Sequence, residues 1–258
     1  MERIAFSLGS LRFTWYGILV VSGFIAGLWL AERRSGRDRI APEVVADLGL
    51  WLMAGGIIGA RVWFVVAYWR EEFAGYPWWE TVAIYRGGLV FYGGLIGASL
   101  VTVFYARAKA VPLWKLADVL APSIALGQAC GRVGCFLYGC CYGSVCSLPW
   151  AVHYPDLPPQ APGTGLHPTQ LYEAGLDLML YGALAWQYRH KQFSGHTFAA
   201  YLIAYGALRF AVEFLRGDYP VRYLGGWATP GQVGSIIAVA TGVLIWKMRR
   251  AAETHRPA

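Results

Sequence analysis

Two arginines lie inside long apolar stretches of this sequence. Arg132 interrupts the small-residue run from Gly127 to Gly143, and Arg209 lies within the apolar run 197–215. A charge at such a depth is costly in a membrane, so an intramembrane arginine indicates a functional site. The guanidinium group presents a planar fork of donors that matches a phosphate group and stays charged at working pH. Two of them on separate segments could hold one phosphodiester.

The alternative for each arginine is an ion pair that only ties helices together. Glu213 follows Arg209 by one helical turn and is the expected partner in that case. Tyr205, Arg209 and Glu213 share one helix face at i, i+4 and i+8, which indicates a buried polar site. A third arginine in an apolar run, Arg61, is a weaker candidate because its long side chain can reach an interface.

A histidine opens the segment HPTQLYE, before another apolar run. This residue, His167, can act as an acid, a base or an oriented donor near neutral pH. In the structural alternative, His167 and Glu173 cap the helix and pair with each other or with a loop. Tyr16 and Tyr92 are either site residues or interfacial anchors, the ordinary role of tyrosine in membrane proteins.

The five cysteines all lie in one short window and are Cys130, Cys135, Cys140, Cys141 and Cys146. Zinc ligands normally occur as C-x(2–4)-C pairs. No C-x-x-C pair occurs here, and the successive spacings are 5, 5, 1 and 5. We therefore expect no metal and no cofactor, and thiol redox chemistry is the alternative use of this segment.

The composition indicates a polytopic membrane protein that is all-α. Of the 258 residues 57% are hydrophobic and only 14% are charged, whereas soluble domains carry about 25% charged residues. The net charge of +7 is explained by basic residues that flank membrane helices. No nucleic-acid-binding motif occurs, so we expect no nucleic acid partner.

Seven apolar runs have about the length of ~20 residues that crosses a bilayer. They lie at 13–31, 44–68, 88–106, 116–137, 169–188, 197–215 and 229–246. Lys and Arg favour the segments that would be cytoplasmic if the N-terminus lies outside, which also places the C-terminus inside. Residues 1–258 are therefore expected to form a single membrane domain, with a proline-rich outer loop at 143–168. Thr229 and Pro230 are expected to cap and open the last helix.

These segments together resemble the prolipoprotein diacylglyceryl transferase family over nearly the whole chain. The resemblance rests on WYG at 15–17, RGGLVFYGGLIG at 86–97, GRVGCFLYGCCYG at 131–143, PWAV at 149–152, HPTQLYE at 167–173, RFAVEFLRGDYP at 209–220 and GQVGS at 231–235. Each fragment alone is weak, and their order along seven spans makes the set specific.

The resemblance implies a bacterial inner-membrane enzyme that moves the diacylglyceryl group of phosphatidylglycerol to a cysteine thiol. The acceptor is the lipobox cysteine of a prolipoprotein signal peptide, and glycerol phosphate leaves. The implied catalytic residues are Arg132 and Arg209, which hold the phosphate, with Tyr92 and His167 handling protons. The implied substrate-binding residues are Tyr16, Tyr205, Glu213, Arg86, Gly93 and Gly94.

The sequence departs from the commoner family pattern at three positions. Tyr92 replaces a histidine, and Cys135 and Cys140 replace an asparagine and a glutamate. Two alternatives therefore stay open beside the transferase. One is a divergent relative that performs thiol redox or another lipid or thiol transfer, and the other is a non-catalytic binder of lipid or signal peptide.

Overall fold

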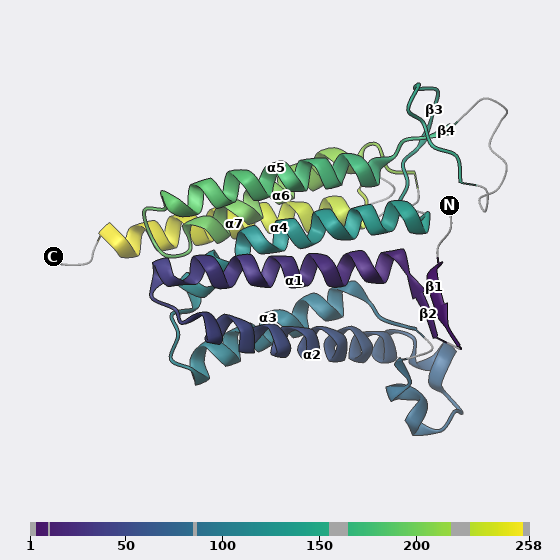
Figure 1. Ribbon diagram of the computed structural model, residues 1–258, viewed down its shortest axis with the longest axis horizontal. Helices are drawn as coiled ribbons and strands as arrows, with labels where there is room; N and C mark the ends of the chain where they lie inside the picture. The colour runs from purple at the N-terminus through teal and green to yellow at the C-terminus, as the bar shows by residue number, and fades with distance from the viewer. Residues whose placement is uncertain (1–3, 10, 85–86, 155–164, 218–227, 255–258) are drawn as a thin grey trace. The chain divides into compact units, whose positions relative to one another are not determined.

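The protein is an all-α chain of long helices with two short strand pairs (Figure 1). The computed structural model describes residues 4–9, 11–84, 87–154, 165–217 and 228–254. The helices are α1 (Trp15–Ser35), α2 (Pro42–Ala67), α3 (Phe91–Ala108), α4 (Leu113–Tyr138), α5 (Thr169–Arg189), α6 (His196–Glu213) and α7 (Pro230–Thr254). Each of the seven predicted apolar runs is confirmed as a helix.

Within the described residues, five helices are long and apolar enough to cross a membrane, namely α1, α2, α3, α4 and α7. The other two, α5 and α6, are long enough to be spans but carry more polar residues. Those of α5 include Gln170, Glu173 and Asp177, all at most 6% exposed. Polar side chains that face the protein interior lower the hydropathy of a helix without exposing charge to lipid.

Short irregular elements join the helices. An antiparallel hairpin of β1 (Ile4–Leu8) and β2 (Leu11–Thr14) precedes α1 and was not expected from the sequence. The short helices η1 (Gly36–Asp38), η2 (Trp69–Phe73) and η3 (Trp78–Val82) follow α1 and α2. The described part of the proline-rich segment contains no helix, and β3 (Val145–Cys146) pairs there with β4 (Gly165–Leu166).

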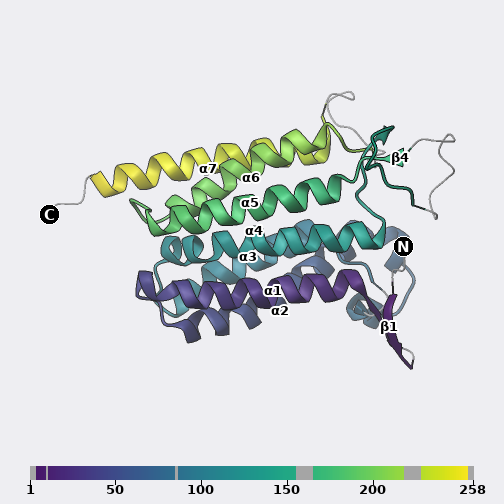
Figure 2. The same cartoon turned by 45° about the horizontal axis from the view of Figure 1, so that its top comes forward.

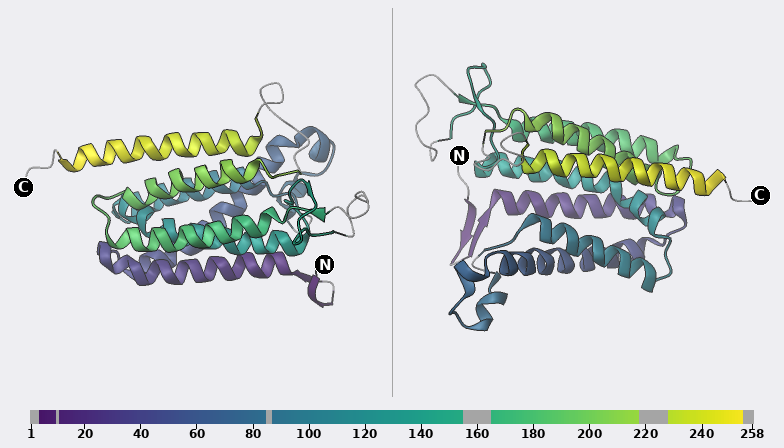
Figure 3. Two further views of the ribbon diagram at one scale, coloured as in Figure 1. Left: turned by 90° about the horizontal axis from the view of Figure 1, so that it is seen from above. Right: turned by 180° about the vertical axis from the view of Figure 1, so that it is seen from behind.

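The chain divides into two compact units. The first comprises Met1–Ala31 and Ala117–Ala258, and the second comprises Glu32–Leu116. Within the first unit α6 and α7 pack along their length, as all views show, and the β3–β4 pair lies where α5 begins (Figures 2 and 3). The same unit packs the N-terminal part of α1 on α4, since a Cβ at Gly23 would lie 2.6 Å from the Cβ of Cys130.

The second unit is organised by the packing of α2 on α3. Gly55 and Gly59 of α2 meet Gly93 and Gly97 of α3, and a Cβ at Gly59 would collide with the carbonyl oxygen of Gly93. Small residues one turn apart let two helix backbones approach this closely. The G-x-x-x-G spacing at these two sites is thus explained by helix packing.

Candidate active site

The centre of the first unit is an ion-pair network that joins three helices. The carboxylate of Glu173 on α5 accepts from Nε of Arg132 on α4 through one oxygen. Its other oxygen accepts from Nη1 of Arg209 on α6 at 2.6 Å. Glu173 is 6% exposed. One buried carboxylate therefore bridges the two arginines that the sequence singles out.

The network continues from Arg209 to the start of α7. Nη2 of Arg209 lies 2.7 Å from Oε2 of Glu213, the i,i+4 partner expected from the sequence. The hydroxyl of Thr229 donates to Oε1 of Glu213 at 2.6 Å and accepts from the backbone N–H of Gln232 at 3.2 Å. Thr229 therefore caps α7, as predicted. The side chain of Glu213 is fully buried and joins α6 to the start of α7. Its substrate-binding role stays a prediction.

The two arginines differ in what remains for a ligand. Within the described residues Arg132 is bound only through Nε, which leaves Nη1 and Nη2 as donors. Its side chain is 20% exposed, against 11% for Arg209. Arg209 is held by two carboxylates. Arg132 is therefore the more exposed arginine of the two, and both of its terminal nitrogens lie outside the ion pairs.

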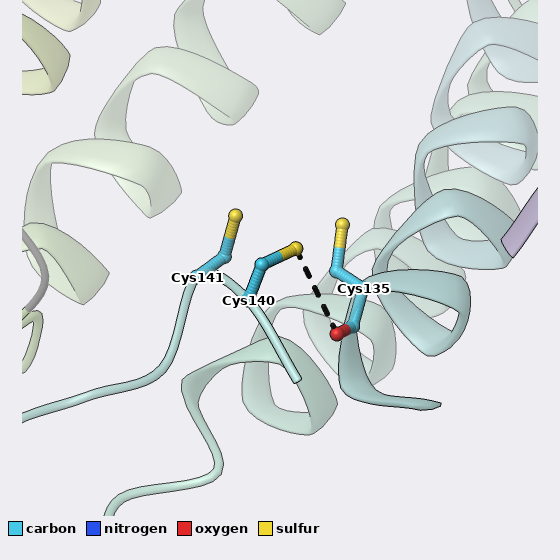
Figure 4. Close-up of side chains that lie close together, drawn as sticks. All are labelled: Cys135, Cys140 and Cys141. Atoms are coloured by element: carbon cyan, nitrogen blue, oxygen red, sulfur yellow. Dashed lines mark hydrogen bonds between the residues drawn. The ribbon is translucent and has the colours of Figure 1, made fainter. Parts of the chain in front are cut away.

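Three of the five cysteines gather where α4 ends. The Sγ atoms of Cys135, Cys140 and Cys141 all lie within 4.8 Å of one another, and none of the three is in a disulfide. Their sulfur atoms point to the same side (Figure 4), and the thiol of Cys140 also contacts the carbonyl oxygen of Cys135 at 3.8 Å. We refer to Cys135, Cys140 and Cys141 as the thiol cluster.

The HPTQLYE segment holds the backbone of the thiol cluster in place. The hydroxyl of Thr169 donates to the carbonyl oxygen of Cys141 at 3.0 Å, and Nε2 of Gln170 donates to that of Cys140 at 2.6 Å. Both side chains are at most 1% exposed. The two motifs that are most informative in the sequence, GRVGCFLYGCCYG and HPTQLYE, are thus locked together.

The surroundings of the cluster shift the acidity of two groups in the loops. Hydrogen bonds from the thiols of Cys135 and Cys140 lower the pKa of the Cys141 thiol, and the positive charges of Arg216 and Arg132 act in the same direction. Burial raises the pKa of Tyr154 to about 12. These neighbours favour the thiolate form of Cys141, while Tyr154 stays neutral.

His167 is held mainly by its backbone. Its N–H donates to the carbonyl oxygen of Ser144 at 3.0 Å, and its own carbonyl accepts from Gly143 at 2.9 Å. Nδ1 lies 3.4 Å from the hydroxyl of Tyr172. The alternative pairing of His167 with Glu173 is not seen, because Glu173 faces the arginines. A proton-handling role for His167 stays a prediction.

The two predicted tyrosines of the first unit lie on different helices. Tyr16, on α1, is 42% exposed and packs against Gly134 of α4. Tyr205, on α6, stacks on Tyr201 with ring centroids 5.6 Å apart and lies within electrostatic range of both arginines. Tyr16 also lies within electrostatic range of Arg132. The substrate-binding roles of both tyrosines stay predictions.

The remaining predicted site residues belong to the second unit. Tyr92 is 50% exposed near the start of α3. Gly93 and Gly94 pack against the backbone of α2 at Gly59 and Gly56, which is sufficient to explain both glycines. Arg86 lies outside the described residues. The catalytic role of Tyr92 and the substrate-binding roles of Arg86, Gly93 and Gly94 stay predictions.

Two carboxylic acids of α5 were not assigned to the site from the sequence. Glu173 was considered as a helix cap and a partner of His167 or of a loop, and Asp177 was not considered. Asp177 is 3% exposed and lies one turn beyond Glu173, within electrostatic range of Arg132 and Arg209. The i,i+4 spacing of two acids on one face of a long helix was the available signal.

Known proteins resemble this chain over nearly its whole length. Residues 3–248 match the family model of prolipoprotein diacylglyceryl transferase. A phosphatidylglycerol–prolipoprotein diacylglyceryl transferase of Chromohalobacter salexigens is 32% identical, with 99% of this chain and 96% of the relative covered. One of the same name from Synechococcus elongatus is 36% identical over 93% of this chain and 85% of its own. Another, from Nitratidesulfovibrio vulgaris, is 35% identical, with 98% of this chain and 96% of the relative covered. The chain therefore belongs to the prolipoprotein diacylglyceryl transferase family.

Proposed function

We propose that this protein transfers the diacylglyceryl group of phosphatidylglycerol to the lipobox cysteine of prolipoproteins and releases glycerol phosphate. The observation that carries the proposal is the fork of Arg132. It is fixed by Glu173 through Nε and leaves its terminal nitrogens for an anion. The names of the relatives support the two substrates. The cytoplasmic membrane of a bacterium, with the N-terminus outside, is the location that we propose.

The reaction requires the stabilisation of charge on a leaving phosphate. As the carbon–oxygen bond breaks, negative charge grows on the phosphate oxygen that leaves with glycerol phosphate. A guanidinium that already points its donors at that oxygen stabilises the transition state without reorganising. Glu173 keeps Arg132 in one orientation and so prepares it for this task. Arg209 secures Glu173 from the other side.

The test uses the full chain in detergent with phosphatidylglycerol and a synthetic lipobox peptide. Glycerol phosphate release and the mass of the peptide are followed together. Transfer predicts a mass gain of one diacylglyceryl group for each glycerol phosphate released. A peptide with serine in place of its cysteine is the control and should gain nothing.

Two other outcomes would contradict the proposal. If the protein retains phosphatidylglycerol but releases no glycerol phosphate, it is a binder. If glycerol phosphate appears without a mass gain on the peptide, the protein is a phospholipid hydrolase that transfers the diacylglyceryl group to water.

A further inference from the structure

The thiol cluster has the donor set of a metal site. Its three Sγ atoms lie within 4.8 Å of one another, and no imidazole or carboxylate of the described residues joins this group. Tetrahedral zinc with Zn–S bonds of about 2.3 Å keeps its sulfur ligands about 3.8 Å apart. The three thiols therefore reach this geometry by small side-chain movements. Ligands made only of sulfur favour a thiophilic metal over magnesium or calcium.

The turn that gathers the thiols is strained and firmly held. Gly139 has φ +81° and Cys141 has φ +64°, so two left-handed residues reverse the chain where α4 ends. The N–H groups of Gly139 and Cys140 both donate to the carbonyl oxygen of Cys135, at 3.0 and 3.2 Å. A side chain in the left-handed region persists where the surroundings enforce it, often at functional sites. Here the enforcing bonds come from Thr169 and Gln170.

Positive charges stand beside the cluster. Arg132 and Arg216 are both close enough to act on the charge of Cys141. Three thiolates around one divalent ion carry a net charge of about −1, which these arginines offset. All three cysteines are only half-buried, so a ligand from outside can reach them.

We propose that Cys135, Cys140 and Cys141 bind one zinc ion whose fourth position takes the thiol of the acceptor cysteine. The second part rests on the proposed function. Three protein ligands with one open position are the arrangement of catalytic zinc, whereas structural zinc has four. A thiol that coordinates zinc loses its proton. The site therefore converts the acceptor into a thiolate next to Arg132, which holds the phosphate.

The step is a two-electron substitution without a change of oxidation state. The acceptor thiol displaces a water from zinc and gives its proton to solvent. Its sulfur then attacks the glyceryl carbon that bears the phosphate, so a C–S bond forms as the C–O bond breaks. The oxygen takes the electron pair and leaves as glycerol phosphate. The product thioether is neutral, binds zinc weakly and is replaced by water.

Metal binding is tested on the full chain, purified in detergent. A reductant that is not a thiol keeps the cysteines reduced without competing for the metal. Elemental analysis should find about one zinc per chain. Cobalt in its place should show the sulfur-to-cobalt charge-transfer absorption of thiolate ligands. Cys135→Ser and Cys141→Ser should each weaken zinc binding at least tenfold. Cys146→Ser is the matched control, because Cys146 is a free, half-buried cysteine outside the cluster, and it should bind as the parent does.

The open position is tested by adding lipobox peptides to the cobalt protein. The cysteine peptide should add a thiolate ligand and change the charge-transfer band, and the serine peptide should not. This readout needs no phosphatidylglycerol and no turnover. Removal of zinc by a chelator should lower diacylglyceryl transfer at least tenfold, and added zinc should restore it.

Four results would overturn the inference. The first is a cluster whose thiols all react freely and bind neither zinc nor cobalt, and the second is binding of monovalent copper alone. The third is a disulfide within the cluster of the active protein, and the fourth is full transfer by the metal-free protein. The last would leave the proposed function intact. Conversely, zinc binding with the predicted response to the cysteine peptide but no transfer would sustain the metal site and reject the proposed function.

Discussion

Arg61 and Arg132 are both arginines in the interior of apolar helices, yet they are bound in different ways. Every nitrogen of the Arg61 guanidinium donates to a backbone carbonyl. Nε donates to Thr81 at 2.8 Å, Nη2 to Glu80 at 2.7 Å, and Nη1 to Gly87 and Gly88 at 2.8 and 3.2 Å. Arg61 is 8% exposed. It holds the segment between α2 and α3 in place, and backbone carbonyls take four of its five N–H donors.

Arg132 instead forms an ion pair with a charged partner. Its Nε donates to the carboxylate of Glu173, and its terminal nitrogens have no partner among the described residues. The comparison teaches that the depth of an arginine in an apolar helix does not reveal its role. What separates a structural arginine from a ligand-binding one is how many of its donors the fold has already used. The following predictions test this distinction.

The largest effect on stability is expected for Glu173→Gln. The change removes the carboxylate that bridges the two buried guanidinium groups, while Arg209 keeps its ion pair with Glu213. Removing one partner of a buried ion pair costs about 3–5 kcal/mol. The free energy of unfolding in mixed detergent measures this loss. Asp177→Asn is the matched control, an equally buried acid on α5 without an ion pair in the described residues, and it should cost much less. Equal losses would show that the bridge is not what holds these helices.

The largest effect on turnover is expected for Arg132→Lys, and Arg61→Lys is its comparison. Lysine keeps the charge but loses the fork. Removing a preorganised donor from a developing oxyanion costs about 10²- to 10³-fold in kcat, so Arg132→Lys should reduce diacylglyceryl transfer to this extent with a small change in unfolding. Arg61→Lys should show the reverse, because it loses bonds to carbonyl groups of the fold. Transfer rates per folded molecule and unfolding midpoints are measured on both variants. If both lose turnover alike, the distinction drawn here is wrong.

Local patterns in the sequence account for most of the fold. The predicted apolar runs coincide with α1 to α7 to within a few residues at nearly every helix boundary, because most runs are bounded by glycine, proline or charged residues. The Arg209–Glu213 pair and the Thr229 cap follow from fixed spacings within one helix or at its start. Interactions of this kind depend on helical geometry alone, so they are visible in the sequence.

The centre of the site depends on contacts between distant segments. Glu173 meets Arg132 and Arg209 only because α5 packs between their helices, and no spacing encodes this. The thiol cluster depends on a left-handed conformation at Cys141, which a non-glycine residue rarely adopts. Four residues separate Cys135 from Cys140, which is within the range of paired zinc ligands. The sequence prediction of no metal relied on the absence of C-x-x-C and did not use this C-x(4)-C spacing.

A smaller effect is expected for alanine at two glycines that each begin a G-x-x-x-G spacing, Gly93 and Gly127. A Cβ at Gly93 would collide with the carbonyl oxygen of Gly59 and the Cβ of Trp63, whereas a Cβ at Gly127 meets nothing within 4 Å. Gly93→Ala should therefore destabilise the protein by about 1–3 kcal/mol through overpacking. Gly127→Ala is the matched control and should be neutral or slightly stabilising, because alanine favours the helix. Thermal unfolding of both variants measures the difference, and a tolerated Gly93→Ala would contradict the close packing of α2 on α3.

The smallest effect is expected for Thr229→Ala, which tests whether Glu213 is an anchor or a substrate ligand. The change removes the cap of α7 and the hydroxyl that donates to Glu213. Loss of a helix cap costs about 0.5–2 kcal/mol, and Thr229→Ser, which keeps the hydroxyl, should recover most of it. If Glu213 only joins α6 to α7, turnover per folded molecule should change no more than stability explains. A rise in KM for phosphatidylglycerol without such a loss of stability would instead mean that Glu213 reaches the lipid. The ion-pair network would then bind substrate along its whole length, and Arg209 would belong with Arg132 among the ligand-binding arginines.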